Sequence, residues 1–290
     1  MGGCNKGNNI SNAINKLKKM FKTGKKKFAI YFSFFIALAG SGMLLIGGIG
    51  LYGFAILIAL CAALILYYID DLKVHTEKQM HIERWVQEKN IEAWLSIREQ
   101  ISFQMPLKQL SGYAAAPDFA NYLLSLVLTK KPQKIVELGC GFSTLVMAKA
   151  LQKLKSTGHI YSYEADEKYI AQCKQQLQEE GVIEFVTIIY APYKIIKLQN
   201  KQWNWYAIEN ENSDIDMLII DGPPKSLGAL SRYPALPFFL PKMSAQFLIC
   251  ADDAARDDLQ HIAELWKNEF QQIKIQYHPL TRGCFEITER

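Results

Sequence analysis

The longest uncharged stretch of this chain constrains its fold more than any other feature. Residues 28–69 contain 42 consecutive positions without Asp, Glu, Lys, Arg or His. A helix crosses a bilayer with about 20 apolar residues, so a single span would leave half of this run unused. Gly47, Gly48 and Gly50 lie near its middle, and glycine permits a sharp reversal between two helices. We therefore expect a hairpin of two transmembrane helices, over residues 28–46 and 51–69.

The charges around this run predict its orientation. Residues 1–27 hold eight Lys and no acidic residue, so the formal net charge of +5 leaves −3 for the rest of the chain. Lys beside a membrane span stays on the cytoplasmic side, and both ends of a hairpin lie on one side of the bilayer. We expect a membrane protein with two spans in the lipid bilayer. Its basic segment, residues 1–27, and its large C-terminal domain would both be cytoplasmic.

The composition excludes several classes of protein. Half of the residues are hydrophobic and only 21% are charged, which does not fit a disordered chain. Because the excess positive charge is confined to the N-terminal segment, we expect no nucleic-acid partner. The six Cys have no CxxC spacing and form no cluster with His in the sequence. We interpret them as reduced thiols, not as zinc ligands or disulfides.

Two segments follow the uncharged run. Residues 70–103 lack Gly and Pro and carry apolar residues at helical intervals, which predicts a helical connector. In residues 104–290 short apolar runs alternate with helical stretches, as in βαβ units. We expect an α/β domain with a doubly wound, Rossmann-like sheet of seven strands that ends in an antiparallel hairpin. The expected strands are residues 134–138, 160–164, 185–189, 217–221, 247–251, 272–277 and 284–288.

Ligands of such sheets bind beyond the carboxyl ends of the strands, so the residues there are the candidates for a site. The first strand leads into a turn with Gly139 and Gly141, and a helix follows at Ser143. Glycines let the backbone approach a ligand, and the helix N-terminus would face it. Thr144 stands where the dinucleotide fingerprint GxGxxG has its third glycine, which argues against a nicotinamide-dependent oxidoreductase. Glu164, at the end of the second strand, could accept hydrogen bonds from ribose hydroxyls.

Three carboxylates follow the fourth and fifth strands. Asp221 ends the fourth strand, and Asp252 and Asp253 follow the fifth. If they converge on one edge of the sheet, a divalent cation would relieve their repulsion, and oxygen ligands favour Mg²⁺ or Mn²⁺. The alternative is that one Asp caps a helix and the others are solvated. Both interpretations remain open at this point.

Residues 104–290 resemble the class I S-adenosylmethionine-dependent methyltransferases, in the branch of small-molecule O-methyltransferases. The resemblance is carried by ELGCGFST, YEAD, YAPYK, IDGPPK, and SRYPALPFFLPKM leading to LICADDAAR. It implies S-adenosylmethionine as the cofactor, with Glu164 on the ribose hydroxyls, Ala191 near the adenine and Asp221 under the sulfonium. The cofactor-binding residues that it implies are Glu137, Gly139, Gly141, Ser143, Glu164, Ala191 and Asp221.

The metal-dependent catechol and caffeoyl-type enzymes of this branch have an Asp after the fourth strand and an Asp-Asn pair after the fifth. Asp221, Asp252 and Asp253 are similar to this set, with Asp253 in place of the Asn. The resemblance therefore implies that these three residues hold Mg²⁺ or Mn²⁺. It also implies catalytic roles for Asp221 and for Lys225, the nearest candidate for a general base, which stands one residue further along than in the pattern.

The expected function is O-methylation of a hydroxyl group. A position at the bilayer favours a small-molecule, lipid-linked or glycan acceptor at the membrane surface. The alternative is a membrane-tethered interaction protein whose methyltransferase fold has lost catalysis. Gly139, Gly141, Glu164 and Asp221 are all intact, whereas decay would be expected to alter some of them. The acceptor and the oligomeric state stay open.

Overall fold

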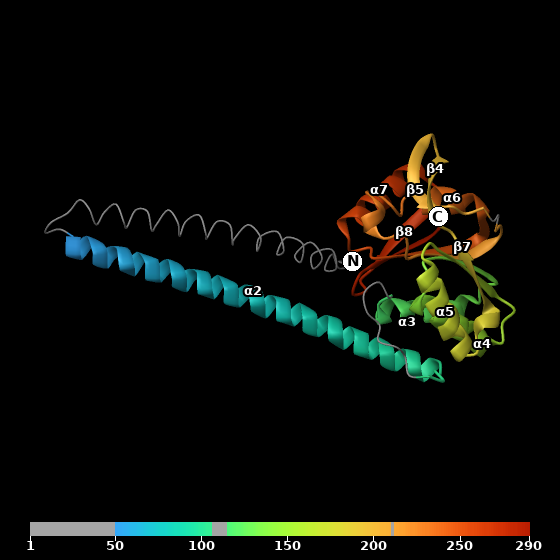
Figure 1. The fold of residues 1–290 in the computed structure, drawn as a ribbon, viewed down its shortest axis with the longest axis horizontal. Coiled ribbons are helices and arrows are strands. Elements are labelled where there is room, and N and C mark those ends of the chain that lie inside the picture. The colour runs from blue at the N-terminus through green and yellow to red at the C-terminus, as the bar shows by residue number, and fades with distance from the viewer. Residues whose placement is uncertain (1–49, 106–114, 210–211) are drawn as a thin grey trace. The chain divides into compact units, whose positions relative to one another are not determined.

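A computed structural model describes residues 50–105, 115–209 and 212–290. Figure 1 shows one long helix, α2, and a mixed α/β domain with helices on both sides of a sheet. The chain divides into two compact units, Met1–Val86 and Gln87–Arg290.

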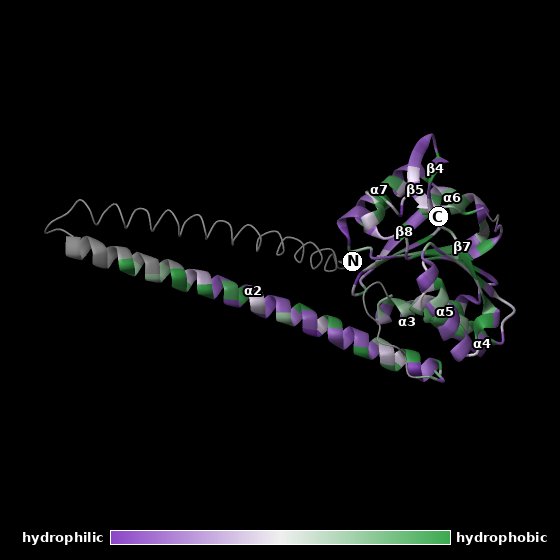
Figure 2. Ribbon diagram, viewed as in Figure 1, coloured by the Kyte–Doolittle hydropathy of each residue, from purple (hydrophilic) through white to green (hydrophobic). Residues whose placement is uncertain are grey.

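Helix α2 (Gly50–Gln100) includes most of the region that was expected to hold the second span and the connector. The first expected span, residues 28–46, lies outside the described residues. The second, residues 51–69, falls in α2, which continues unbroken past Asp70 into a charged stretch (Figure 2). Helix α2 therefore runs without a break from the second expected span into the expected helical connector, because residues 70–100 contain neither Gly nor Pro to interrupt it.

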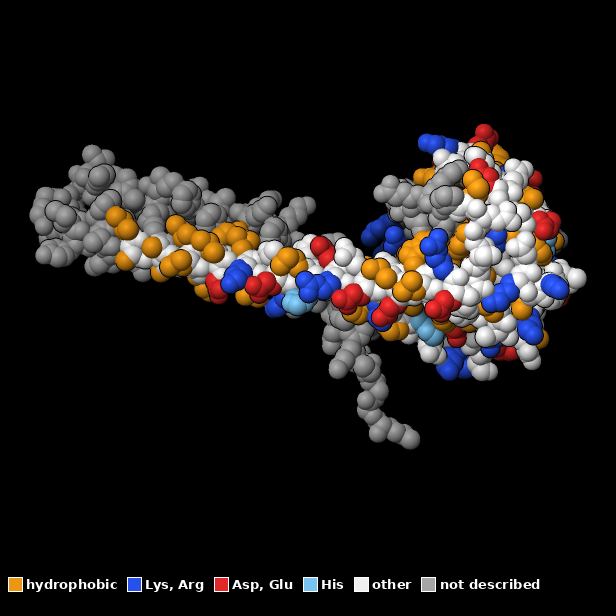
Figure 3. Space-filling view, turned by 90° about the horizontal axis from the view of Figure 1, so that it is seen from below, with side chains coloured by type: hydrophobic (Ala, Val, Ile, Leu, Met, Phe, Trp, Pro, Cys, Tyr) orange, Lys and Arg blue, Asp and Glu red, His pale blue; other side chains and the backbone are white. Residues whose placement is uncertain are grey.

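Several large apolar side chains of α2 are exposed, among them Ile58, Leu66 and Ile91. Figure 3 shows hydrophobic side chains along the surface of this helix. In the ranges that the structure describes, no helix has the length and apolarity needed to cross a membrane.

The compact α/β unit begins earlier than the expected boundary at residue 104. Its first residues are the last turns of α2, where Ala93 and Ile97 are buried. Ile97 belongs to the hydrophobic core of the domain together with Ile101, and the ring of Trp94 packs against Phe142 with centroids 5.1 Å apart. The helical spacing of apolar residues near the end of α2 is thus explained by the packing of these residues in the core of the domain.

A sheet of seven strands forms the centre of this unit, as predicted. The strand order is β3-β2-β1-β6-β7-β9-β8, with β9 antiparallel to both of its neighbours. Each expected strand is present, although β7 begins at Met243 and not at residue 247. The strands are β1 (Lys134–Leu138), β2 (His159–Glu164), β3 (Val186–Tyr190), β6 (Ile215–Ile220), β7 (Met243–Asp252), β8 (Ile273–His278) and β9 (Cys284–Glu289).

Helices cover both faces of this sheet (Figure 1). One hydrophobic core contains residues of α3, α4 and α5, and a second contains residues of α6 and α7. Side chains alternate between these cores along each strand, so Ile219 belongs to the first and Ile220 to the second. The helices are α3 (Pro117–Lys130), α4 (Phe142–Leu154), α5 (Glu167–Glu179), α6 (Ala235–Phe239) and α7 (Asp257–Glu269).

The connection from β3 to β6 differs from an ordinary βαβ crossover. In its described residues it contains a separate antiparallel hairpin, β4 (Tyr193–Leu198) and β5 (Lys201–Tyr206), and no helix. Trp205 is fully buried in the second core and packs against Phe238 of α6, with ring centroids 5.2 Å apart. The hairpin therefore covers the sheet face that a crossover helix would otherwise cover.

Candidate functional site

The carboxyl ends of the parallel strands lie along one edge of the sheet. Leu138 at the end of β1 is paired with Tyr163 of β2 and with Ile220 of β6, and Ile220 is paired with Ala251 of β7. The residues that follow these four strands are therefore neighbours in space. This alignment brings the glycine turn, Glu164 and the three Asp residues to the same edge.

The turn between β1 and α4 has the open backbone that was expected of it. Gly139 has a φ of +98°, which a residue with a side chain rarely adopts, and its N–H donates to the Tyr163 carbonyl at 2.8 Å. At Gly141 an added Cβ would meet no heavy atom within 4 Å. The backbone at Gly141 is thus accessible to a ligand, next to the N-terminus of α4.

Glu137 lies beneath this turn and faces inward. Its fully buried carboxylate accepts hydrogen bonds from the hydroxyls of Ser143 at 2.6 Å, Thr144 at 2.5 Å and Ser162 at 2.8 Å. Burial raises the pKa of Glu137 to about 7, although the three hydroxyls oppose the rise. The side chains of Glu137 and Ser143 therefore support the turn from inside the domain. Only the main chain of Ser143, at the N-terminus of α4, is left for a ligand to contact.

Glu164 connects the end of β2 to the glycine turn. Its Oε1 accepts from the N–H groups of Ala165 at 2.7 Å and Asp166 at 2.9 Å, and its Oε2 accepts from the Cys140 N–H at 3.3 Å. Burial raises the pKa of this carboxyl, while the main-chain donors oppose the rise. The carboxylate is thus held rigidly beside the turn, and its remaining lone pairs can accept from a ligand hydroxyl.

Of two further residues with predicted roles, Ala191 is buried at this edge of the sheet, whereas Lys225 has an exposed side chain. Ala191 is buried after β3, and its N–H donates to the Glu164 carbonyl at 2.8 Å. The structure thus brings Ala191 next to Glu164, and its role near the adenine stays a prediction. Lys225 has a side chain that is 64% exposed, and its Nζ lies 3.8 Å from Asp258. The structure therefore places Lys225 beside Asp258 and not among the three Asp residues of the expected metal site.

Those three Asp residues, Asp221, Asp252 and Asp253, form a compact cluster that we call the acidic cluster. One carboxylate oxygen of each lies within 4.8 Å of the others. Asp252 is completely buried, and neither of its carboxylate oxygens has a hydrogen-bond partner in the described parts of the chain. Burial raises the pKa of Asp252 well above its ordinary range, and Asp221 and Asp253 add to the rise. Burial also raises the pKa of Asp221 to about 7, and Arg232 limits that rise.

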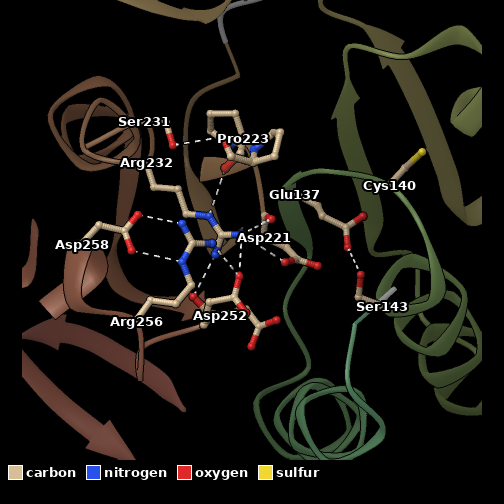
Figure 4. A network of polar contacts seen from close by, with 12 residues as sticks. Glu137, Cys140, Ser143, Asp221, Pro223, Ser231, Arg232, Asp252, Arg256 and Asp258 are labelled. Atoms are coloured by element: carbon tan, nitrogen blue, oxygen red, sulfur yellow. Dashed lines mark hydrogen bonds and ion pairs between the residues drawn. The ribbon is translucent and has the colours of Figure 1, made fainter. Parts of the chain in front are cut away.

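Two arginines that were not predicted as site residues enter the acidic cluster (Figure 4). Arg232 is buried and comes from the segment between β6 and α6. Its Nη2 lies 3.0 Å from Asp253 Oδ2 and 3.5 Å from Asp221 Oδ1. Arg256 donates to the same Asp253 oxygen at 2.9 Å and forms two hydrogen bonds with Asp258. The only hint in the sequence is that Arg232 is the single charged residue in the segment SRYPALPFFLP.

Arg232 also holds the main chain at the ends of two strands. Its Nη1 donates to the Asp252 carbonyl at 2.8 Å, its Nη2 to the Asp221 carbonyl at 2.5 Å, and its Nε to the Pro223 carbonyl at 3.3 Å. One guanidinium group thus joins the ends of β6 and β7. The positions of Asp221 and Asp252 relative to each other depend on it.

These residues fit both of the groups that the resemblance implied. The open backbone at Gly141 and the carboxylate of Glu164 suit a nucleoside-containing cofactor. The unpartnered buried carboxylate of Asp252 suits a cation, because an isolated buried charge is very unfavourable. Hard oxygen donors of this kind favour Mg²⁺ or Mn²⁺ over Zn²⁺.

Comparison with known proteins tests the prediction of a methyltransferase. Residues 136–254 match the family described as "Methyltransferase domain". The chain contains a methyltransferase domain. The matched range of the methyltransferase domain includes the glycine turn, Glu164 and the whole acidic cluster, and the prediction that this chain is a methyltransferase is confirmed. None of the curated proteins compared with the chain matches it.

Several solved structures are similar to this chain at low sequence identity, and the one with a TM-score above 0.5 shares its fold. An SAH-bound methyltransferase from Podospora anserina is 16% identical, with a TM-score of 0.51 over 74% of this chain and 96% of that one. A methyltransferase from Geobacter sulfurreducens is 16% identical, with a TM-score of 0.48 over 61% of this chain and 81% of that one. An O-methyltransferase from Bacillus cereus in complex with SAH is 15% identical, with a TM-score of 0.46 over 70% of this chain and 91% of that one.

Proposed function

We propose that this chain is an S-adenosylmethionine-dependent O-methyltransferase that acts on a hydroxyl group with the help of a divalent cation. One observation carries the proposal: the glycine turn and the acidic cluster are in contact. A Cβ at Gly139 would lie 3.5 Å from the Gly222 nitrogen and 3.6 Å from the Asp221 carbonyl carbon, and the Asp221 N–H donates to Leu138 at 3.1 Å. A cofactor on the turn and an acceptor at the cluster would therefore be adjacent.

The residues of the edge have separate tasks in this proposal. Glu164 accepts hydrogen bonds from the ribose hydroxyls, Gly141 lets the backbone contact the cofactor, and Ala191 lies near the adenine. Glu137 keeps the turn in place through Ser143 and Thr144. S-adenosylmethionine supplies a methyl group on a sulfonium that is already a good leaving group, so the protein has mainly to align the acceptor and accept its proton.

Asp221 and Asp252 would hold the cation, with Asp253 contributing its second oxygen, since its Oδ2 already accepts from two arginines. A cation of this kind lowers the pKa of a hydroxyl that binds to it. Lys225 stays a prediction as the general base. If it accepts the proton, Lys225→Met will lower kcat and remove one limb of the pH profile. A Lys242→Met variant, which changes another partly exposed lysine, serves as its control.

We also propose that residues 28–69 anchor the enzyme to a membrane, with the methyltransferase domain in the cytoplasm. The support is the uncharged run of 42 residues behind eight Lys. An acceptor at the bilayer surface, such as a lipid-linked or glycan hydroxyl, follows from that location. Fractionation of cells that express the full chain tests the anchor: recovery in the membrane pellet after a carbonate wash supports it, and recovery in the supernatant contradicts it.

Calorimetry on the full-length chain in mild detergent tests the cofactor site. We expect micromolar binding of S-adenosylmethionine, at least tenfold weaker in Glu164→Gln and unchanged in Glu184→Gln, which alters an exposed carboxylate. Unchanged binding in both variants would place the cofactor elsewhere. A folded chain that binds no S-adenosylmethionine at all would favour the tethered, non-catalytic interaction protein.

A further inference from the structure

The acidic cluster contains more negative charge than a single divalent cation would neutralise, and the two arginines change that balance. Asp221, Asp252, Asp253 and Asp258 contribute four carboxylates, and Arg232 and Arg256 contribute two guanidinium groups that contact three of them. These six groups therefore have a net charge of −2 when all are ionised, and the exposed ammonium group of Lys225, 3.8 Å from Asp258, lies outside this set. One divalent cation brings this net charge to zero.

The contacts of the two arginines are distributed unevenly over the three Asp residues of the acidic cluster. This uneven distribution indicates which carboxylates would bind the cation. Asp253 Oδ2 accepts from both arginines, at 3.0 and 2.9 Å. Asp221 has only the longer contact of 3.5 Å with Arg232. Asp252 has its carbonyl bound by Arg232, yet both of its carboxylate oxygens lack a partner among the described residues. The arginines thus neutralise one side of the acidic cluster and leave the side of Asp252 and Asp221 available.

The other charged groups near the acidic cluster do not change this pattern. Lys225 reaches Asp258 only at 3.8 Å from a side chain that is 64% exposed, so water screens it. Arg282 lowers the pKa of Asp221, as Arg232 does, but by less. Arg232 differs from both because its side chain is 4% exposed, where charge interactions are screened least.

We propose that Arg232 and Arg256 are built-in counter-charges that match the acidic cluster to one divalent cation, and that Arg232 is in addition the positioning residue that fixes Asp221 against Asp252. This inference rests on the cation site of the proposed function and adds what determines its charge preference. Arg232 touches no reacting atom in this proposal. It acts through the charge of the guanidinium group and through its hydrogen bonds to the main chain of β6 and β7.

A comparison of two ions tests the proposal without any measurement of activity. Mn²⁺ and Tb³⁺ are titrated separately into the full-length protein by calorimetry, and the ratio of their dissociation constants is followed. Removing one buried positive charge favours a trivalent ion more than a divalent one. We expect Arg232→Gln to shift the ratio at least tenfold toward Tb³⁺, and Arg256→Gln, whose side chain is 26% exposed, to shift it less in the same direction.

Two further variants separate charge from position. Arg232→Lys keeps the charge but cannot bridge three carbonyl groups, so both ions should bind more weakly while their ratio stays as in the unaltered chain. Arg98→Gln removes an exposed arginine of α2 and should leave the dissociation constants of both ions unchanged. If Arg232→Gln does not fold, the direction of the shift in Arg256→Gln decides.

The outcomes that overturn the inference are distinct from those that overturn the proposed function. An unchanged ratio in folded Arg232→Gln, or an equal shift in Arg232→Lys, contradicts the counter-charge role while the cation site stands. An unaltered chain that binds neither ion contradicts the cation site, and the counter-charge role with it. Binding of S-adenosylmethionine in the same preparation shows separately whether the cofactor site is intact.

Discussion

The hydroxyl of Thr144 lies 2.5 Å from a carboxylate oxygen of Glu137 and at the same time accepts the N–H of Gly141 at 2.9 Å. A buried acid in β1 thus determines the backbone position of a glycine that an incoming ligand would touch. The chain of contacts explains why an acidic residue precedes the turn even though its side chain faces the core. It also makes the turn sensitive to the protonation state of Glu137.

Glu137→Gln should alter the pH dependence of folding. Burial raises the pKa of Glu137 from its ordinary value of 4.5 to about 7 in the folded chain. Because the folded pKa is the higher one, the contribution of Glu137 to stability is complete below the unfolded pKa and is lost as the pH rises through the folded pKa. We expect the free energy of unfolding of the unaltered chain, relative to Glu137→Gln, to fall by about 3 kcal/mol between pH 4.5 and 8. Urea unfolding across this range measures it, and a constant difference would contradict the raised pKa.

Gly139→Ala should lower the stability of the chain, whereas Gly141→Ala should lower its affinity for the cofactor. A side chain at Gly139 is strained by the φ of +98°, so we expect a loss of stability of about 1 kcal/mol or more. At Gly141 the backbone is extended and no atom lies within 4 Å of the added Cβ, so stability should hardly change. The new methyl group would instead occupy the space where the cofactor approaches, and affinity for S-adenosylmethionine should fall at least tenfold. Equal affinity in Gly141→Ala would move the cofactor away from this turn.

Asp252→Asn should stabilise the chain in the absence of metal and remove its response to metal. The buried carboxylate of Asp252 has no partner within the described residues, so an amide of the same size removes an unfavourable charge. In chelator we expect the melting temperature of the variant to be a few degrees above that of the unaltered chain, about 2–4 °C for each kcal/mol gained. Excess Mn²⁺ should raise the melting temperature of the unaltered chain only. Destabilisation of the variant in chelator would show that Asp252 has a partner that we have not identified.

Lys149 and Glu180 form a second buried ion pair, 2.8 Å long, in which Glu180 also accepts the N–H groups of Gln104 and Met105. The side chains are 4% and 2% exposed. Lys149→Met leaves an unpaired buried carboxylate, and we expect it to lower the free energy of unfolding by about 3–5 kcal/mol. Lys89→Met breaks the exposed pair with Glu92 and should lower it by less than about 1 kcal/mol. Similar losses in the two variants would contradict the burial of the first pair.

Much of the domain could be predicted from the sequence, because strand positions depend on the local pattern of apolar residues. Short runs such as the one at 134–138 are apolar enough to be buried on both faces, and a glycine or an acidic residue stands at the carboxyl end of four of the five parallel strands. Parallel strands place these following residues side by side, so the convergence of Glu164, Asp221 and Asp252 could be inferred from the strand pattern alone. The hairpin β4 and β5 was not predicted, because only its packing against α6 distinguishes it from a helical crossover.

The sequence by itself therefore determined which segments are buried strands, which residues follow them, and that the chain is a methyltransferase. The tertiary structure decided which charged groups meet. Arg232 is 11 residues from Asp221 and 20 from Asp252, and no local pattern relates these positions. The same holds for the inward side chain of Glu137, whose partner Ser162 is 25 residues away on a neighbouring strand. Local periodicity reports whether a side chain is buried, whereas its partner in the interior depends on how distant segments align.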